Sequence, residues 1–258
     1  MAARNGHTEV VQTLVDECEA KCDIRDNHGR TPVHMAAIYG HEEVLRALLG
    51  AGAPANTLDN NSHTPLHYAA FHGQDGCVSA LVEDEVEWYA AGESLFGPLH
   101  CAAANGHSDC LESLLETDNE QLDVNAIDAY GRAPIHLAAH GGHDQCIQVL
   151  LHCEIDQLDG RNQTALMIAC SRKRYEAAVV LIEQGNANFQ QTDSQGNNTL
   201  HLVFMGKAEA EGCHAVLHSA LEQLESNDIS PKAIADLLNT PDSTGTRLAC
   251  GWGGEGGR

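Results

Sequence analysis

Apolar side chains in this chain recur in short blocks, and each block opens with a four-residue motif that usually ends in histidine. The tetrads are Thr31–His34, Thr64–His67, Gly97–His100 and Ala133–His136, with degenerate copies at Thr164–Met167 and Asn198–His201. Their last residues follow one another at steps of 33, 33, 36, 31 and 34 residues. Threonine is favoured as a helix N-cap and proline at the first helical position. Each tetrad therefore predicts the start of a short helix.

A second apolar block follows each tetrad at a constant distance. Six positions beyond the tetrads come Gly40, Gly73, Gly106 and Gly142, and glycine is typical of a helix end with a left-handed residue. Apolar residues at ten and fourteen positions beyond, such as Val44 and Leu48, predict one face of a second helix. An Asp-x-x-Gly stretch such as Asp26–Gly29 supplies turn chemistry between the pairs. Since one pair cannot bury its own apolar face, the pairs must stack into an all-α repeat solenoid.

These columns resemble the ankyrin-repeat family over almost the whole chain. The resemblance implies a helix-loop-helix plus a β-hairpin or turn in each repeat of about 33 residues. We expect a partial repeat at 1–30 that lacks its tetrad, core repeats at 31–204, an irregular insert with a partial terminal repeat at 205–249, and a disordered glycine-rich tail at 250–258. The missing tetrad suggests part of a longer array. Within the insert, Ser230–Leu238 predicts a further helix.

Composition narrows the function classes. The chain has 258 residues, with 14 Lys+Arg against 37 Asp+Glu and a formal net charge of −23. So acidic a surface argues against nucleic-acid partners, and no apolar run is long enough for membrane insertion. Ten cysteines without a tight framework, and no signal peptide, predict reduced thiols in the cytoplasm or nucleus.

Candidate catalytic groups have a structural interpretation in each case. His136, His140 and His143 stand at helical spacing and could ligate a metal, but tetrad histidines recur through the chain. Cys77, Cys110 and Cys146 occupy one predicted core column, and Gly251–Gly256 matches a dinucleotide fingerprint without the helix it requires. We therefore expect no catalytic residues, no metal and no cofactor. A metal-dependent enzyme is kept as the alternative from another class.

The family resemblance implies that partners bind the concave side, at the hairpin tips and the exposed ends of the first helices. The candidate partner-binding residues are Tyr39, Phe71, His72, Trp88, Tyr89, Asn105, Tyr130, His140 and Arg172. Trp88 and Tyr89 are two large aromatics at a predicted hairpin tip, and they either anchor a partner or pack against an adjacent tip. Arg172–Arg174 is the only basic triplet, and it either meets an acidic partner or offsets the chain's own field.

Irregular features suggest a particular branch of the family. The stretch Cys77–Val86, followed by Phe96–Ala102, is similar to the regulatory ankyrin-repeat subunits of serine/threonine-protein phosphatase 6. That resemblance implies a non-catalytic scaffold that holds a Ser/Thr phosphatase catalytic subunit or its adaptor and presents substrates. One alternative is a generic ankyrin adaptor for membrane or transcription-related proteins. Another is a substrate for asparaginyl hydroxylation at Asn56, Asn125 and Asn188, although asparagine also suits the turns themselves.

Overall fold

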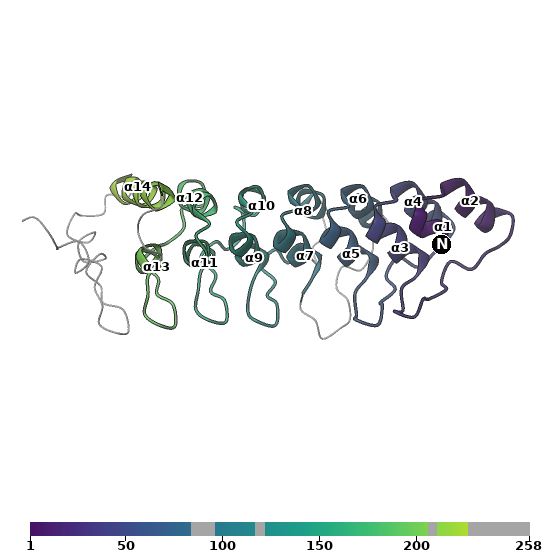
Figure 1. Ribbon diagram of the computed structural model, residues 1–258, viewed down its shortest axis with the longest axis horizontal. Helices are drawn as coiled ribbons and strands as arrows, with labels where there is room; N and C mark the ends of the chain where they lie inside the picture. Colours follow the sequence, from purple (N-terminus) through teal and green to yellow (C-terminus); the bar gives the residue numbers. More distant parts are fainter. Residues whose placement is uncertain (84–95, 117–121, 206–210, 227–258) are drawn as a thin grey trace, which may run out of the picture. The chain divides into compact units, whose positions relative to one another are not determined.

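The computed structural model describes residues 1–83, 96–116, 122–205 and 211–226, and it divides the chain into two units, Met1–Ala129 and Tyr130–Arg258. The helices of unit 1 are α1 (Ala2–Asn5), α2 (Thr8–Asp16), α3 (Pro32–Tyr39), α4 (Glu42–Gly50), α5 (Pro65–His72), α6 (Asp75–Glu83), α7 (Pro98–Asn105) and α8 (Ser108–Leu115). Those of unit 2 are α9 (Pro134–Gly141), α10 (Asp144–Val149), α11 (Ala165–Ser171), α12 (Tyr175–Glu183), α13 (Thr199–Met205) and α14 (Glu211–Ser226). Within each unit the first helices of the pairs form one row and the second helices another (Figure 1).

The tetrads begin helices as predicted. α3, α5, α7 and α9 each start at the proline of a tetrad and end before a glycine with positive φ. In α5 the cap is reciprocal: His67 N–H donates to Thr64 Oγ1 (3.4 Å), and Thr64 N–H donates to Nδ1 of the His67 ring (3.2 Å). The tetrad histidine thus completes a capping box, a role more often taken by glutamate.

The tetrad histidines also connect one repeat to the next. His34 is fully buried, and its Nε2 lies 3.2 Å from the carbonyl oxygen of His63 in the following turn. His136 does the same with the carbonyl oxygen of Gln157, at 2.9 Å. Because Nδ1 accepts a hydrogen bond and Nε2 donates one, each ring must be neutral. Burial accordingly lowers the pKa of His34 and His136, and that of His67 to about 4.

Aspartate organises the turn that precedes several of the tetrads. Asp59 Oδ1 accepts from the N–H groups of Asn61 (2.8 Å) and His63 (2.9 Å), and Asp159 repeats the arrangement in unit 2. Successive turns are joined as well, for example by Gly160 N–H donating to Tyr130 O at 2.9 Å. The expected β-hairpins take the form of turns: in the described residues no strand forms beyond an isolated bridge between Thr192 and Asn198.

The core of each unit lies between the two rows of helices. The predicted cysteine column is confirmed, since Cys77, Cys110 and Cys146 are all buried. Leu114 and Leu150, fourteen positions beyond their tetrads, are fully buried. Small alanines such as Ala36 and Ala37 let the first helices of neighbouring pairs approach closely. The low aromatic content is therefore sufficient for a packed core.

α14 lies in the segment that the sequence predicted to be an irregular insert. It packs against α12 as the second helix of a pair, with Cys213, Val216 and Ala220 buried. Extra residues after α13 break the 33-residue register, which is why the periodicity did not reveal this helix. The predicted helix Ser230–Leu238 and the tail at 250–258 fall outside the described residues. None of the described helices has the length and apolar character needed to cross a membrane.

Candidate protein-binding surface

The exposed side chains of interest lie where each first helix ends and turns into its second helix, which we call the turn surface. In unit 1 it carries Tyr39 and Phe71, which are 43% and 48% exposed. The guanidinium of Arg4 lies over the Tyr39 ring, 5.2 Å from its centroid, and the ring of His41 stacks beside it at 6.4 Å. Tyr39 is thereby held in place while much of its ring faces solvent.

At two of these turns, a histidine from the next repeat packs over the glycine that ends the first helix. The His41 ring packs directly over Gly6, where an added side-chain carbon would lie 2.7 Å from Nδ1, and its Nε2 lies 3.0 Å from Arg4 O. His107 packs over Gly73 in the same way, with its Nε2 3.1 Å from Phe71 O. These glycines therefore provide space for the next repeat as well as the left-handed helix end.

The other candidates of unit 1 differ in how available they are. His72 is exposed and meets the edge of the Phe71 ring at 5.1 Å. Asn105 is exposed, but its side-chain N–H donates to Cys101 O of its own helix at 2.8 Å, so its amide is already engaged. Trp88 and Tyr89 lie outside the described residues, and their role stays a prediction.

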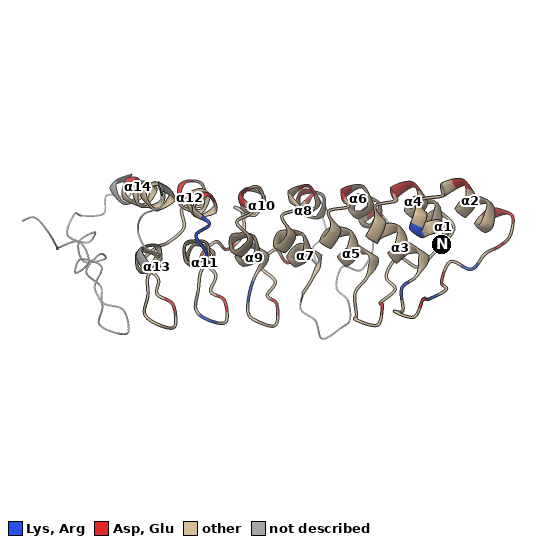
Figure 2. Ribbon diagram, in the orientation of Figure 1, with Lys and Arg blue, Asp and Glu red and all other residues tan. Residues whose placement is uncertain are grey.

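The turn surface of unit 2 is basic. His140 and Arg172 are exposed. Arg172 is the first residue of the triplet Arg172–Arg174, which connects α11 to α12. Figure 2 shows this connection as a basic segment, whereas the first turns of the second helices are acidic. On the turn that leads into α9, Tyr130 is 72% exposed, and the Arg132 guanidinium lies 4.9 Å from the centroid of its ring. Burial lowers the pKa of His140, and the charges of Arg172, Arg132 and Arg174 lower it further. The charges of these three arginines therefore act on one histidine.

Lys173 occupies the helix-ending position that is glycine in the preceding repeats. Its φ is +59°, in the left-handed region that a side chain disfavours. Arg174 takes the place of the histidine that follows, and its side chain lies against Gly142 as His41 lies against Gly6. The basic triplet thus keeps the frame of the repeat while changing what the turn presents.

The alternative of a metal site at His136, His140 and His143 is not supported by the geometry. His136 is fully buried, its Nδ1 accepts from Ala133 N–H at 3.0 Å, and its Nε2 faces Gln157 O. Both ring nitrogens are thus engaged by the backbone, whereas His140 is on the surface. Within the described residues no group of three His, Cys, Asp or Glu side chains is placed to hold a metal ion.

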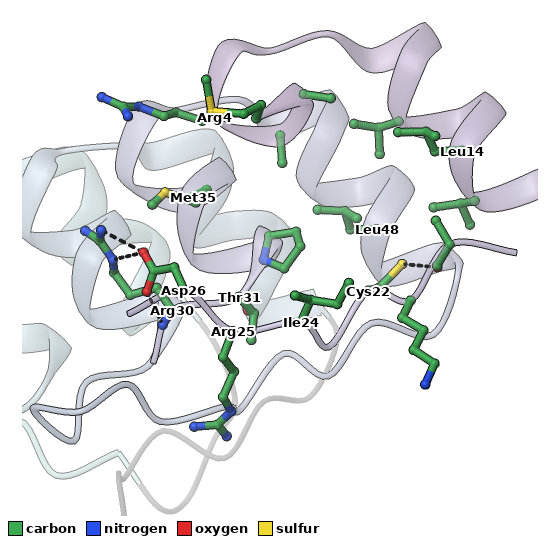
Figure 3. A pocket seen from close by; sticks show the side chains of 18 residues that line it. Arg4, Leu14, Cys22, Ile24, Arg25, Asp26, Arg30, Thr31, Met35 and Leu48 are labelled. Carbon is green, nitrogen blue, oxygen red and sulfur yellow. Dashed lines mark hydrogen bonds and ion pairs between the residues drawn. The ribbon is translucent and has the colours of Figure 1, made fainter. Parts of the chain in front are cut away.

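A hollow of about 390 Å³ opens between α1, α2 and the start of α3 (Figure 3). Its floor is apolar, and at its edge Arg30 pairs with Asp26 at 2.8 Å. Burial raises the pKa of Asp26, but hydrogen bonds from Arg30 and His28 outweigh it and bring the pKa to about 2. Leu14 beside the hollow is 42% exposed, whereas Leu48, one repeat later, is 3% exposed. The hollow is the uncovered side of a helix pair and contains no assembled catalytic group.

These features define a class of protein made of stacked helix pairs whose exposed turns vary from repeat to repeat and serve protein–protein interaction. The model of the family "Ankyrin repeats (3 copies)" matches residues 1–91, 89–159 and 142–220. The chain therefore belongs to the ankyrin-repeat family, and the predicted all-α repeat architecture is confirmed.

Known proteins and structures extend the comparison. The ankyrin repeat domain of human ASB11 is similar in structure, with a TM-score of 0.73, 23% identity, and coverage of 84% of this chain and 95% of that one. The ankyrin repeat domain of Bcl-3, a member of the IkappaB family, gives a TM-score of 0.66 and 22% identity, covering 84% and 96%. Both likenesses concern the fold alone.

Oxysterol-binding protein-related protein 1 is similar over a shorter region. The proteins from Rattus norvegicus and Homo sapiens are each 40% identical to the chain over 65 residues. Each match covers 22% of this chain and 7% of the relative, so it extends to a small part of either protein.

Proposed function

We propose that this ankyrin-repeat protein is a non-catalytic scaffold that holds a Ser/Thr phosphatase catalytic subunit, or its adaptor, and presents substrates to it. The observation that carries the scaffold role is the pair of exposed aromatic rings, Tyr39 and Phe71, on consecutive turns of unit 1. Aromatic side chains are enriched among the residues that contribute most to protein interfaces. The choice of a phosphatase rests on the similarity of Cys77–Val86 and Phe96–Ala102 to phosphatase 6 regulatory subunits.

The proposal also places the protein in the cytoplasm or nucleus. Nine cysteines in the described part of the chain are free thiols. Burial raises the pKa of Cys77, Cys101 and Cys170 to about 12, so these thiols stay protonated and unreactive. Free thiols of this kind are typical of a reducing compartment. Fractionation of cells that express the tagged chain tests this placement, and recovery in a secreted fraction would contradict it.

Co-purification tests the scaffold and its partner together. We would recover tagged wild-type chain from cell extract, identify what accompanies it, and assay the eluate for Ser/Thr phosphatase activity. A Tyr39→Ala/Phe71→Ala variant removes the aromatic pair, and Leu221→Ala, which truncates an exposed leucine on α14, is the control. We expect a Ser/Thr phosphatase catalytic subunit with the wild type and the control, and its loss from the aromatic variant.

The remaining outcomes separate the parts of the proposal. Equal recovery with all three chains would keep the phosphatase and overturn the role of Tyr39 and Phe71. No phosphatase with a folded wild-type chain would overturn the phosphatase partner. If a membrane receptor or a transcription factor is recovered instead, the chain is an adaptor of the generic kind. Phosphatase turnover by purified chain without a partner would contradict its non-catalytic role.

A further inference from the structure

The basic triplet of unit 2 makes no ion pair within the part of the chain that the structure describes. Arg172, Lys173 and Arg174 are all exposed. Arg46 in unit 1 behaves differently, since it pairs with Glu42 at 2.9 Å and with Glu83 at 2.6 Å. In a chain with 37 acidic residues, three adjacent cations without such a pair are available to an external anion.

The neighbouring repeat adds to this positive charge. Arg132 lies on the turn before α9, and the triplet lies after α11, yet both lower the pKa of His140 at the end of α9. Direct contact fixes part of the arrangement, because the Arg174 side chain lies against Gly142, which ends α9. The charges of three arginines from two turns therefore act on the same exposed histidine, and one of these arginines, Arg174, is in contact with the end of α9.

The backbone provides a second, independent indication. Lys173 keeps a left-handed conformation at a position where Gly40, Gly73, Gly106 and Gly142 stand in the preceding repeats. Strain of this kind persists at binding sites and switch regions more often than elsewhere. Lysine at a glycine position adds charge to the turn and contributes nothing to its geometry.

We propose that Arg132, His140 and Arg172–Arg174 form a binding site for an acidic segment of a protein partner. Arginine pairs with carboxylates through two parallel hydrogen bonds, which gives such a site directional specificity. Tyr130, held under Arg132, offers an apolar contact at its border. The inference deepens the proposed scaffold function, because it names the chemistry of one segment that the scaffold would bind.

A peptide of eight glutamate residues is the test ligand. We would titrate it into the full ¹⁵N-labelled chain in 0.1 M salt, where the Debye length is about 10 Å and distant acidic residues are screened. We expect saturable shifts in the amide signals of residues 130–142 and 172–174, and weaker binding at higher salt. Arg172→Glu should weaken binding about tenfold, because it removes an ion pair and adds repulsion.

Lys21→Glu is the matched control, since Lys21 is an exposed cation of unit 1 and the substitution changes the net charge by the same amount. It should alter the affinity by less than about twofold. Thermal melts of both variants check that they fold like the wild type. No saturable shift, shifts confined to unit 1, or equal weakening by both variants would overturn the site. Because the titration contains no phosphatase, its failure leaves the co-purification result untouched, and the reverse also holds.

Discussion

Unit 1 places Tyr39 and Phe71 where its first helices end, whereas unit 2 places His140 and Arg172 at the corresponding turns. The frame beneath them is the same: a proline-started first helix in most repeats, and a side chain packed over the glycine that ends the preceding one. The side chains that differ between the units are exposed, so exchanging them affects packing very little. The comparison teaches that the repeat fixes the positions and leaves their chemistry free to select partners.

The first test asks whether the two units share the same packed frame, and it truncates a core leucine at the same repeat position in each unit. Leu114→Ala and Leu150→Ala should each lower the free energy of unfolding by roughly 2–5 kcal/mol, because both side chains are fully buried and leave cavities. Urea denaturation measures the effect. Leu14→Ala, at the same repeat position but 42% exposed, is the control and should cost much less. A neutral Leu114→Ala would show that the helix register is wrong.

The second test concerns the buried tetrad histidines that both units share. His67 has a folded-state pKa of about 4 because burial disfavours its charged form, against about 6.5 when unfolded. The neutral ring therefore adds stability above pH 6.5, and this contribution is lost as the pH falls from about 6.5 to about 4. The loss from His67 should reach about 3 kcal/mol.

Urea midpoints at pH 7.0, 5.5 and 4.5 measure this decline. Asp26, with a pKa of about 2, loses its contribution only below about pH 4, so it does not obscure the histidine window. His67→Asn should be less stable at pH 7 but should lose less stability on acidification. An unchanged pH slope in that variant would rule out His67 as a source of the acid sensitivity.

The third test addresses the helix-ending position, where unit 1 has glycine and unit 2 has Lys173 with a positive φ. Lys173→Gly should raise the free energy of unfolding by roughly 1 kcal/mol, since glycine accepts a φ of +59° without steric cost. Gly40→Ala, at the same position of unit 1, should lower it, because the added carbon would meet the Gln74 side chain. Thermal or urea unfolding of both variants measures the contrast. If Lys173→Gly stabilises the fold but weakens octaglutamate binding, the charge of Lys173 favours binding while its backbone conformation lowers the stability of the fold.

Sequence reasoning predicts the frame well because its signals are local. Threonine, proline and glycine act within one turn of a helix, so α3, α5, α7 and α9 begin and end where the tetrads predict. The replacement of glycine by Lys173 in the turn after α11 is likewise visible in the sequence. Its left-handed φ follows from the same local rule.

Features that depend on two repeats at once were not predicted. The position of α14 follows from packing against α12 after the spacing has changed, and no periodicity encodes it. The cation over Tyr39 comes from Arg4 in the preceding repeat, and the charges of Arg132 and Arg172, which lie on two separate turns, both lower the pKa of His140. A column alignment shows each residue in its own repeat. It does not show which neighbour's side chain reaches it.

The smallest expected effect is a change of histidine pKa with salt concentration, which distinguishes the electrostatic environments of the two turn surfaces. Burial lowers the pKa of both His140 and His72, but the next causes differ: arginine charges for His140 and His107 for His72. Raising the salt from 0.05 to 1 M shortens the Debye length from more than 10 Å to about 3 Å, so it should raise the pKa of His140 by a few tenths of a unit. Arg172→Ala should produce a rise of the same sign at constant salt. NMR titration of both imidazoles measures these shifts, with His72 as the internal reference. Equal salt responses of the two rings would mean that unit 2 presents no local positive field to a partner.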